Sequence, residues 1–216
     1  MAYYRNRRSF LKTSVLTVSS LVLTGVNCSS KNATEEKSKQ PNIIFILADD
    51  LGCEIPGVYG GETYKTPNVD ALARRGIRFT QCYSSPACAP SRVKLLTGKY
   101  GFRNYIGWGA MKDKERTFAH VLKNAGYKTA IAGKWQMVLQ KNEPDHVQKM
   151  GFDESCVYGW HEGPRYYGPF IYENGKPRKE PDDQYGPDIF CKFITDFIRN
   201  NQGFPFFGLL FYVPAA

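Results

Sequence analysis

A run of five apolar residues at positions 43–47 constrains the fold more than any other stretch of the sequence. The run is too short for a helix, and an uninterrupted apolar run of this length is typical of a strand buried on both faces. Strands of that kind belong to parallel sheets, because helices cover both faces of such sheets. The run therefore predicts an interior strand of an α/β domain.

The pattern continues as helical segments that alternate with further apolar runs. A Thr-Pro start and a terminal glycine predict a helix over residues 68–75, with Val69, Leu72 and Ala73 on its apolar face. The chain is then predicted to return as a strand over residues 77–80. Further helices are expected after Cys88 and over residues 118–124 and 188–200, and further strands over residues 127–132 and 204–213. This alternation indicates an α/β fold with a mostly parallel sheet flanked by helices.

Residues 141–180 show no clear period and are rich in Gly, Pro, Tyr and charge. We expect loops there, which in such positions cover a site or decorate a surface. His146 and His161 fall in this segment and are predicted to be surface histidines rather than ligands. The aromatic and basic side chains of this segment suit contact with a sulfated sugar, although such loops at least as often serve packing; they are Trp160, Arg165, Tyr166 and Tyr167.

The first 28 residues are predicted to be an export signal and not part of the fold. Arg7-Arg8, followed by Phe-Leu-Lys, matches the twin-arginine pattern, and the apolar run at positions 14–26 is too short to span a membrane comfortably. Cys28 is a candidate for lipid modification, with a plain cleaved signal as the alternative. Residues 29–40, rich in Ser, Lys and Glu, are predicted to be a flexible tether, and the folded domain occupies residues 41–216. We expect an exported protein, either periplasmic or anchored to the bacterial envelope by lipid at Cys28.

The charge and the cysteine content exclude several classes of protein. Of the net charge of +9, residues 1–40 carry +5, from seven Lys/Arg against two Asp/Glu, which leaves +4 for the other 176 residues. A balance that mild, with no basic stripe and no zinc spacing, excludes a nucleic-acid partner. The six cysteines have neither C-x-x-C pairs nor regular spacing, so a disulfide framework is not expected.

Two positions carry candidate chemistry. Asp49 and Asp50 directly follow the first predicted strand, where open α/β sheets place their ligands, and a hard divalent cation would relieve the repulsion of adjacent carboxylates. Their ordinary alternative is a solvated turn. Cys88 lies at the start of a short predicted helix with Arg92 one turn further on, and a helix start stabilises negative charge on a nucleophile. Its ordinary alternative is a loop cysteine.

Several segments, in this order, resemble the sulfatase family of the alkaline-phosphatase-like superfamily. They are Pro41-Asn42-Ile43-Ile44 with Asp49-Asp50, Thr66-Pro67-Asn68-Val69-Asp70, Cys88-Ala89-Pro90-Ser91-Arg92 with Leu96-Thr97-Gly98, and Gly126-Tyr127-Lys128-Thr129 with Gly133-Lys134-Trp135. The match runs from about residue 41 to the last residue, and the Cys-x-Pro-Ser-Arg pattern is specific. The chain is thus similar to the N-terminal portion of a sulfatase.

The resemblance implies a reaction and a role for each matching residue. Cys88 would be the precursor of formylglycine, made by a separate maturation enzyme, and one hydroxyl of its hydrate would attack the sulfur of a sulfate ester. The other hydroxyl would then expel sulfate and restore the aldehyde. Asp49, Asp50 and the modified Cys88 would bind Ca²⁺, Arg92 would hold the hydrate in place, and Lys134 would bind the sulfate. The implied substrate is a sulfated small molecule or glycan, such as a carbohydrate or aryl sulfate.

The sequence departs from the family pattern at two places. Gln136 stands where the family often has a histidine, and its amide can donate a hydrogen bond but cannot carry a proton near neutral pH. Further acidic ligands, a histidine and a lysine of the family are not present in these 216 residues. Two carboxylates and one formylglycine are too few for Ca²⁺, which takes about six to eight oxygens, unless water fills the remaining positions. We therefore expect a truncated fold, with negligible sulfatase activity and weak solubility for this chain by itself. Two alternatives stay open, namely a phosphonate or phosphate ester hydrolase of the same superfamily and a degenerate, non-catalytic fragment.

Overall fold

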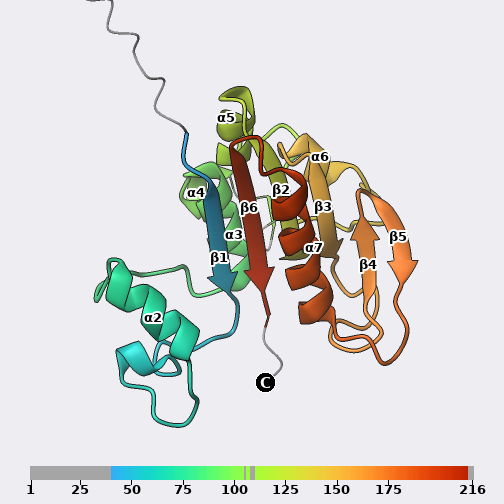
Figure 1. Cartoon of the computed structure of the whole chain (residues 1–216). Helices are drawn as coiled ribbons and strands as arrows, with labels where there is room; N and C mark the ends of the chain where they lie inside the picture. Colours follow the sequence, from blue (N-terminus) through green and yellow to red (C-terminus); the bar gives the residue numbers. More distant parts are fainter. Residues whose placement is uncertain (1–39, 105, 108–109, 214–216) are drawn as a thin grey trace, which may run out of the picture. The chain divides into compact units, whose positions relative to one another are not determined.

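Six strands form one mixed sheet in the computed structural model, which describes residues 40–104, 106–107 and 110–213. Their order across the sheet is β1 (Ile43–Ala48), β6 (Phe206–Tyr212), β2 (Lys128–Lys134), β3 (Glu154–Tyr158), β4 (Phe170–Glu173) and β5 (Lys176–Lys179). The first four are parallel to one another, and β4 and β5 add antiparallel pairs (Figure 1). The prediction of an α/β fold with a mostly parallel sheet is confirmed.

Helices cover both faces of this sheet. The helical segments of the described residues are η1 (Gly57–Tyr59), α2 (Pro67–Arg75), α3 (Cys88–Thr97), α4 (Gly101–Asn104), α5 (Phe118–Asn124), α6 (His146–Lys149) and α7 (Gly186–Asn200). Figure 1 shows α7 in front of the sheet and α3, α4 and α5 behind it. The helices predicted after Cys88 and over residues 118–124 and 188–200 are confirmed, as is the helix that begins near Thr66.

Local sequence signals explain where α5 begins and where α3 ends. Thr117 forms a capping box with His120, because its hydroxyl and the imidazole satisfy backbone groups of the first turn of α5. Gly98 ends α3 with φ +67°, a left-handed conformation that glycine adopts without a steric penalty. These short signals fix the helix ends independently of the packing of the sheet.

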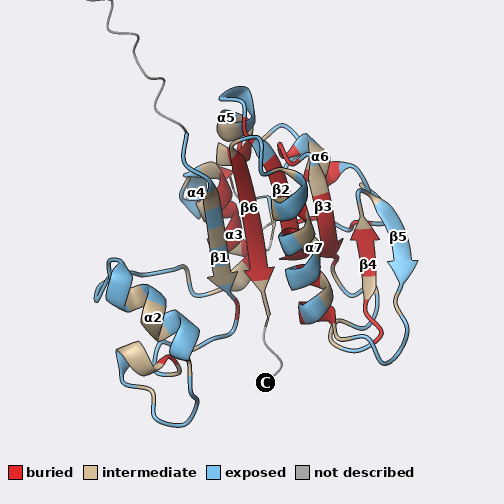
Figure 2. Cartoon of the chain, viewed as in Figure 1, coloured by how far each residue is buried: buried red, intermediate tan, exposed pale blue. Residues whose placement is uncertain are grey.

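Each face of the sheet carries its own apolar core (Figure 2). On one face, side chains of α3, α5 and α6 pack against Ile131, Phe207 and Leu209 of the central strands. On the other face, Phe190, Ile194 and Phe197 of α7 pack against alanines of β2 and Leu210 of β6. Burial on both faces explains why β6 is apolar along almost its whole length and why the centre of β2, residues 130–132, is apolar.

The first strand differs from the prediction of burial on both faces. β1 lies at the edge of the sheet, and its burial alternates along the strand. Ile43, Phe45 and Leu47 pack against the α3 face, whereas Ile44 and Ile46 are 43% and 61% exposed. The reason is that α7 contacts β2, β3 and β6 but does not extend over β1. Among the described residues, nothing covers this apolar half of the edge strand.

The segment that follows β1 also differs from the prediction. α2 forms, but Val69 and Leu72 of its predicted apolar face are 49% and 65% exposed, and α2 contains no buried residue. Residues 77–80 do not form the predicted strand, and Ile77 and Phe79 are largely exposed. A strand requires a neighbouring strand for its backbone hydrogen bonds. No described strand pairs with this segment.

Residues 141–180 are more regular than predicted. They contain α6 and three strands, of which β3 is parallel to β2 and extends the central sheet. β4 and β5 form a hairpin around Asn174 and Gly175, which both have positive φ. Periodicity does not reveal these strands, because they are only four or five residues long, β3 and β4 each contain a glutamate, and β5 consists of Lys, Pro and Arg.

The predicted export signal, the lipid anchor at Cys28 and residues 29–39 of the tether lie outside the described residues. Within residues 40–104, 106–107 and 110–213, no helix is both long and apolar enough to span a membrane.

Candidate active site

Three separate segments of the chain meet at the carboxyl edge of the parallel strands. Asp49 and Asp50 follow β1, Lys134 ends β2, and Cys88 and Arg92 lie in the first two turns of α3. The carboxyl ends of parallel strands meet at one edge, which is where open α/β sheets bind their ligands. The structure thus brings together four of the predicted functional groups from positions up to 85 residues apart along the chain (Asp49 to Lys134).

Asp49 is the centre of a buried charge cluster. Its Oδ2 atom lies 3.1 Å from Nη1 of Arg92 and 2.5 Å from Nζ of Lys134. The exposed fractions of Asp49, Arg92 and Lys134 are 8%, 1% and 5%. Two cations surround one carboxylate, so the cluster carries a net positive charge and favours an anion beside it.

Lys134 connects this cluster to the sulfur of Cys88. Its Nζ atom lies 3.6 Å from Sγ, within the distance of a hydrogen bond to sulfur. Cys88 is the first residue of α3, where the first backbone N–H groups have no partner within the helix. An ammonium group and a helix start therefore both face the side chain at position 88, and both stabilise negative charge there.

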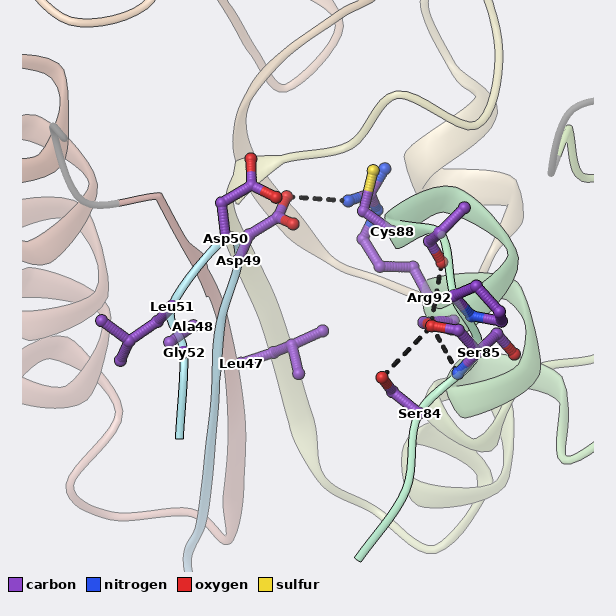
Figure 3. Close-up of a pocket in the computed structure, with 13 residues that line it drawn as sticks. Leu47, Ala48, Asp49, Asp50, Leu51, Gly52, Ser84, Ser85, Cys88 and Arg92 are labelled. Atoms are coloured by element: carbon purple, nitrogen blue, oxygen red, sulfur yellow. Dashed lines mark hydrogen bonds and ion pairs between the residues drawn. The ribbon is translucent and has the colours of Figure 1, made fainter. Parts of the chain in front are cut away.

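Ser91 fixes the loop that precedes Cys88, a role that the sequence reasoning missed. Its hydroxyl lies within hydrogen-bond distance of the carbonyls of Ser85 and Ala87, to one of which its single proton is donated, and it accepts the N–H of Ser85. This loop and the segment after β1 enclose a pocket of about 360 Å³, in which Asp49 and Asp50 face Cys88 and Arg92 (Figure 3). The only sequence signal for Ser91 was its place in the Cys-x-Pro-Ser-Arg pattern.

Arg92 retains unused hydrogen-bonding capacity. Its Nε and Nη2 atoms are buried and have no hydrogen-bond partner among the described residues. Buried donors are normally satisfied, because each one left without a partner costs about 1–3 kcal/mol. Because Arg92 is one of the residues that line the pocket, an oxygen-rich ligand there is a candidate partner for these donors.

Asp50 and Gln136 are less closely integrated into the cluster. Asp50 lines the pocket but is exposed, and it has φ +57°. Gln136 is buried with φ +46°, and its amide lies 3.5 Å from the carbonyl of Gly159. In the described part of the chain, the structure gives Gln136 no hydrogen bond to Cys88 or Asp49.

Gly133 allows β2 to deliver Lys134 to the cluster. It has φ +99°, and a Cβ atom at this position would lie 2.1 Å from the carbonyl oxygen of Phe211 in β6. Only glycine combines that backbone conformation with so close an approach of the neighbouring strand.

A comparison with protein-family models matches residues 41–213 to the family described as Sulfatase. The chain belongs to the sulfatase family. It is 38% identical over 178 residues to an N-acetylglucosamine-6-O-sulfatase of Bacteroides thetaiotaomicron, an alignment that covers 81% of this chain and 30% of that protein. It is 41% identical over 149 residues to the steryl-sulfatase of Homo sapiens, covering 62% and 24%.

Solved sulfatase structures share the fold. One that is described as a complex with its substrate, D-glucosamine-2-N,6-O-disulfate, matches with a TM-score of 0.67 and 34% sequence identity. The match covers 81% of this chain and 34% of the other. The chain therefore has part of the alkaline-phosphatase-like fold of the sulfatases and spans about a third or less of the length of these three proteins.

The sulfatase site has the right chemistry for part of a calcium site. Asp49 and Asp50 offer carboxylate oxygens, which are the ligands that Ca²⁺ prefers. Two carboxylates supply at most four of the six to eight oxygens that this ion takes. Among the described residues, no group of three or more His, Cys, Asp or Glu side chains is placed to hold a metal. The carboxylate oxygens of Asp49 and Asp50 are thus suitable ligands for Ca²⁺, but they are too few to complete its coordination shell.

A buried histidine supports the segment that follows Lys134. His146 is fully buried, and its Nδ1 atom accepts the indole N–H of Trp135 at 3.2 Å. Its Nε2 atom lies 3.0 Å from the carbonyl of Met111, so the neutral ring must carry its proton on Nε2. The prediction that His146 lies on the surface is wrong, because α6 turns this side chain inward against Trp135. His161 is exposed, as predicted.

The stability of the protein is expected to fall as the pH falls through the range in which His146 takes up a proton. Burial lowers the pKa of His146 below its ordinary value of 6.5, so below pH 6.5 the unfolded state binds more protons than the native state. Protonation would also remove the acceptor for Trp135. Urea denaturation between pH 7.5 and 5.5 should show this loss. The variant His146→Gln should reduce the dependence of the unfolding free energy on pH, whereas His161→Gln should retain it. An equal dependence on pH in the wild-type protein and both variants would contradict the role given to His146.

Proposed function

We propose that this chain carries the nucleophile of a sulfatase that hydrolyses sulfate esters, with Cys88 converted to formylglycine. The observation that supports this most directly is the convergence of Lys134 on both Cys88 and Asp49, at 3.6 and 2.5 Å. Family membership supports the reaction class, since the related proteins are named as sulfatases. Formylglycine would supply the covalent nucleophile in this site.

The roles of the other side chains follow from their contacts. Lys134 would bind a sulfate oxygen and offset charge on the departing alcohol, because its ammonium group faces position 88. Arg92 would hold the nucleophile and the sulfate through the Nε and Nη2 donors that have no partner in the described residues. Asp49 would keep both cations in place. Gln136, which cannot carry a proton, would serve only as a hydrogen-bond donor.

We propose Ca²⁺ as the metal of the active protein, held in part by Asp49, Asp50 and the modified Cys88. When bound, this ion would polarise the sulfate oxygens and neutralise developing charge. The described residues supply too few oxygens to complete its shell, so we propose that the chain by itself has negligible activity. Robust turnover of an aryl sulfate by the purified chain would contradict this.

We propose a sulfated carbohydrate as the substrate class. The relative that aligns with 81% of this chain is named as an N-acetylglucosamine-6-O-sulfatase, and a structural neighbour is described with a disulfated glucosamine. The substrate would be met after export, since the first 28 residues resemble a twin-arginine signal. A formylglycine maturation enzyme is then required as a partner, and it would act before export.

The experiment that tests this proposal is mass spectrometry of the peptide that carries position 88. Co-expression with a formylglycine-generating enzyme should convert the thiol to an aldehyde, in the cytoplasmic as well as the exported fraction. The variant Cys88→Ala should lack the aldehyde, whereas the matched control Cys82→Ala, which removes an exposed cysteine of the preceding loop, should retain it. A free thiol at position 88 in the mature protein would overturn the proposal.

A further inference from the structure

A tyrosine beside the proposed active site has a buried hydroxyl without a partner. Tyr158 is the last residue of β3 and the register partner of Lys134 on β2, so the two Cα atoms are about 5 Å apart. The residue is 3% exposed, and its hydroxyl makes no hydrogen bond among the described residues. A buried hydroxyl normally has a partner, so this one marks a place where a polar group belongs.

A basic side chain lies directly over this tyrosine. The guanidinium carbon of Arg165 lies 5.8 Å from the centroid of the Tyr158 ring, in the arrangement of a cation–π contact. Arg165 is half-buried, and in the described part of the chain no carboxylate lies within ion-pair distance of it. The donors of its planar fork are therefore available for an anion.

Tyr158 lies close enough to the charged side chains of the proposed active site to interact with them. Burial raises the pKa of the Tyr158 phenol, and the charges of Arg165, Asp49 and Arg92 also act on it. The hydroxyl thus stays protonated at neutral pH and can donate to an anion. Asp49 is already shared by Arg92 and Lys134, so it does not neutralise Arg165. Lys134 and Arg165 thus lie on either side of Tyr158, the first as its register partner on β2 and the second over its ring.

We propose that Arg165 and Tyr158 form a second anion subsite, which binds a further sulfate or carboxylate group on the sugar whose sulfate ester faces Cys88. The guanidinium would bind two oxygens of that group and the Tyr158 hydroxyl would donate to one of its oxygens, while the Tyr158 ring remains the platform on which Arg165 stacks. This inference rests on the proposed function and deepens it. The protein would select carbohydrates that carry two anionic groups over those that carry one.

Binding of two sugars distinguishes this subsite from the sulfate site at Cys88. Titration calorimetry would compare D-glucosamine-2-N,6-O-disulfate with glucosamine 6-O-sulfate on the whole chain. The wild-type protein should bind the disulfate at least roughly tenfold more tightly, as expected for hydrogen bonds to a charged group. Arg165→Met should remove most of this preference while it changes the affinity for the monosulfate by less than about twofold. Tyr158→Phe should reduce the preference by a smaller factor, because it removes only the hydroxyl.

The controls separate the possible failures. Arg199→Met removes an exposed arginine in the last turn of α7 and should leave the preference for the disulfate unchanged. Arg165→Lys, which retains the charge without the planar fork, should restore part of the preference. Equal affinity of the wild-type protein for both sugars, or equal loss for both in Arg165→Met, would overturn the subsite alone. If the protein binds neither sugar nor inorganic sulfate, both the subsite and the proposed function are overturned.

Discussion

Replacement of Asp49 by alanine is expected to lower the free energy of unfolding by about 3–5 kcal/mol. The variant would leave the cations of Arg92 and Lys134, which are 1% and 5% exposed, without their shared carboxylate. Removal of one partner from a buried ion pair is costly because the remaining charge stays out of water. Urea denaturation should show a lower midpoint with little change in the slope.

Two further variants separate charge from packing in this prediction. Asp49→Asn retains the size and one acceptor oxygen of the side chain but loses the charge, so its midpoint should fall between those of the wild type and Asp49→Ala. Asp196→Ala breaks ion pairs with Lys192 and Arg199 on the exposed side of α7, and it should leave the midpoint nearly unchanged. Equal midpoints for Asp49→Ala and Asp196→Ala would show that the buried cluster does not stabilise the fold.

The same cluster shows how much of the site the sequence predicts. Cys88, Arg92, Lys134 and Asp49 were identified by the family pattern together with their places at strand ends and at a helix start. The parallel sheet then brings them together, since its carboxyl ends share one edge. The pairing of one carboxylate with two cations was not predictable, because side-chain distances depend on the packing of all three segments.

Elements with strong local signals were predicted correctly. α7 combines an apolar stripe with a Gly-Pro start, β6 is apolar along almost its whole length, and β2 has an apolar centre at residues 130–132. β3, β4 and β5 lack such signals because they are only four or five residues long and each contains at least one charged residue. Their existence depends on contacts between segments, which periodicity does not encode.

Burial was predicted less well than secondary structure. Ile44 and Ile46 have the sequence of an interior strand, yet the described chain leaves them exposed at the edge of the sheet. His146 lies in a polar, loop-rich stretch of sequence that is typical of the surface, yet two specific hydrogen bonds hold it in the core. In both cases the neighbours of a residue across space decide its exposure, and its neighbours along the chain do not reveal them.

Gly133 shows how the backbone of the sheet shapes the site, and its replacement is expected to have an effect as large as that of Asp49→Ala. In Gly133→Ala the new Cβ atom would lie 2.1 Å from the backbone oxygen of Phe211, at φ +99°. Backbone strain of about 1–3 kcal/mol and overpacking of about 1–3 kcal/mol together predict a loss of roughly 2–6 kcal/mol. β2 and β6 would have to separate beside Lys134, so the contact between Lys134 and Cys88 should also be lost.

The matched control for this variant is Gly60→Ala. Gly60 has φ +96°, but a Cβ atom there would meet nothing within 4 Å, so the control carries the backbone strain without the collision. Thermal unfolding should therefore place Gly60→Ala between the wild-type protein and Gly133→Ala. If the two variants unfold at the same temperature, the close approach of β6 makes no contribution, and the left-handed conformation alone explains the requirement for glycine before Lys134.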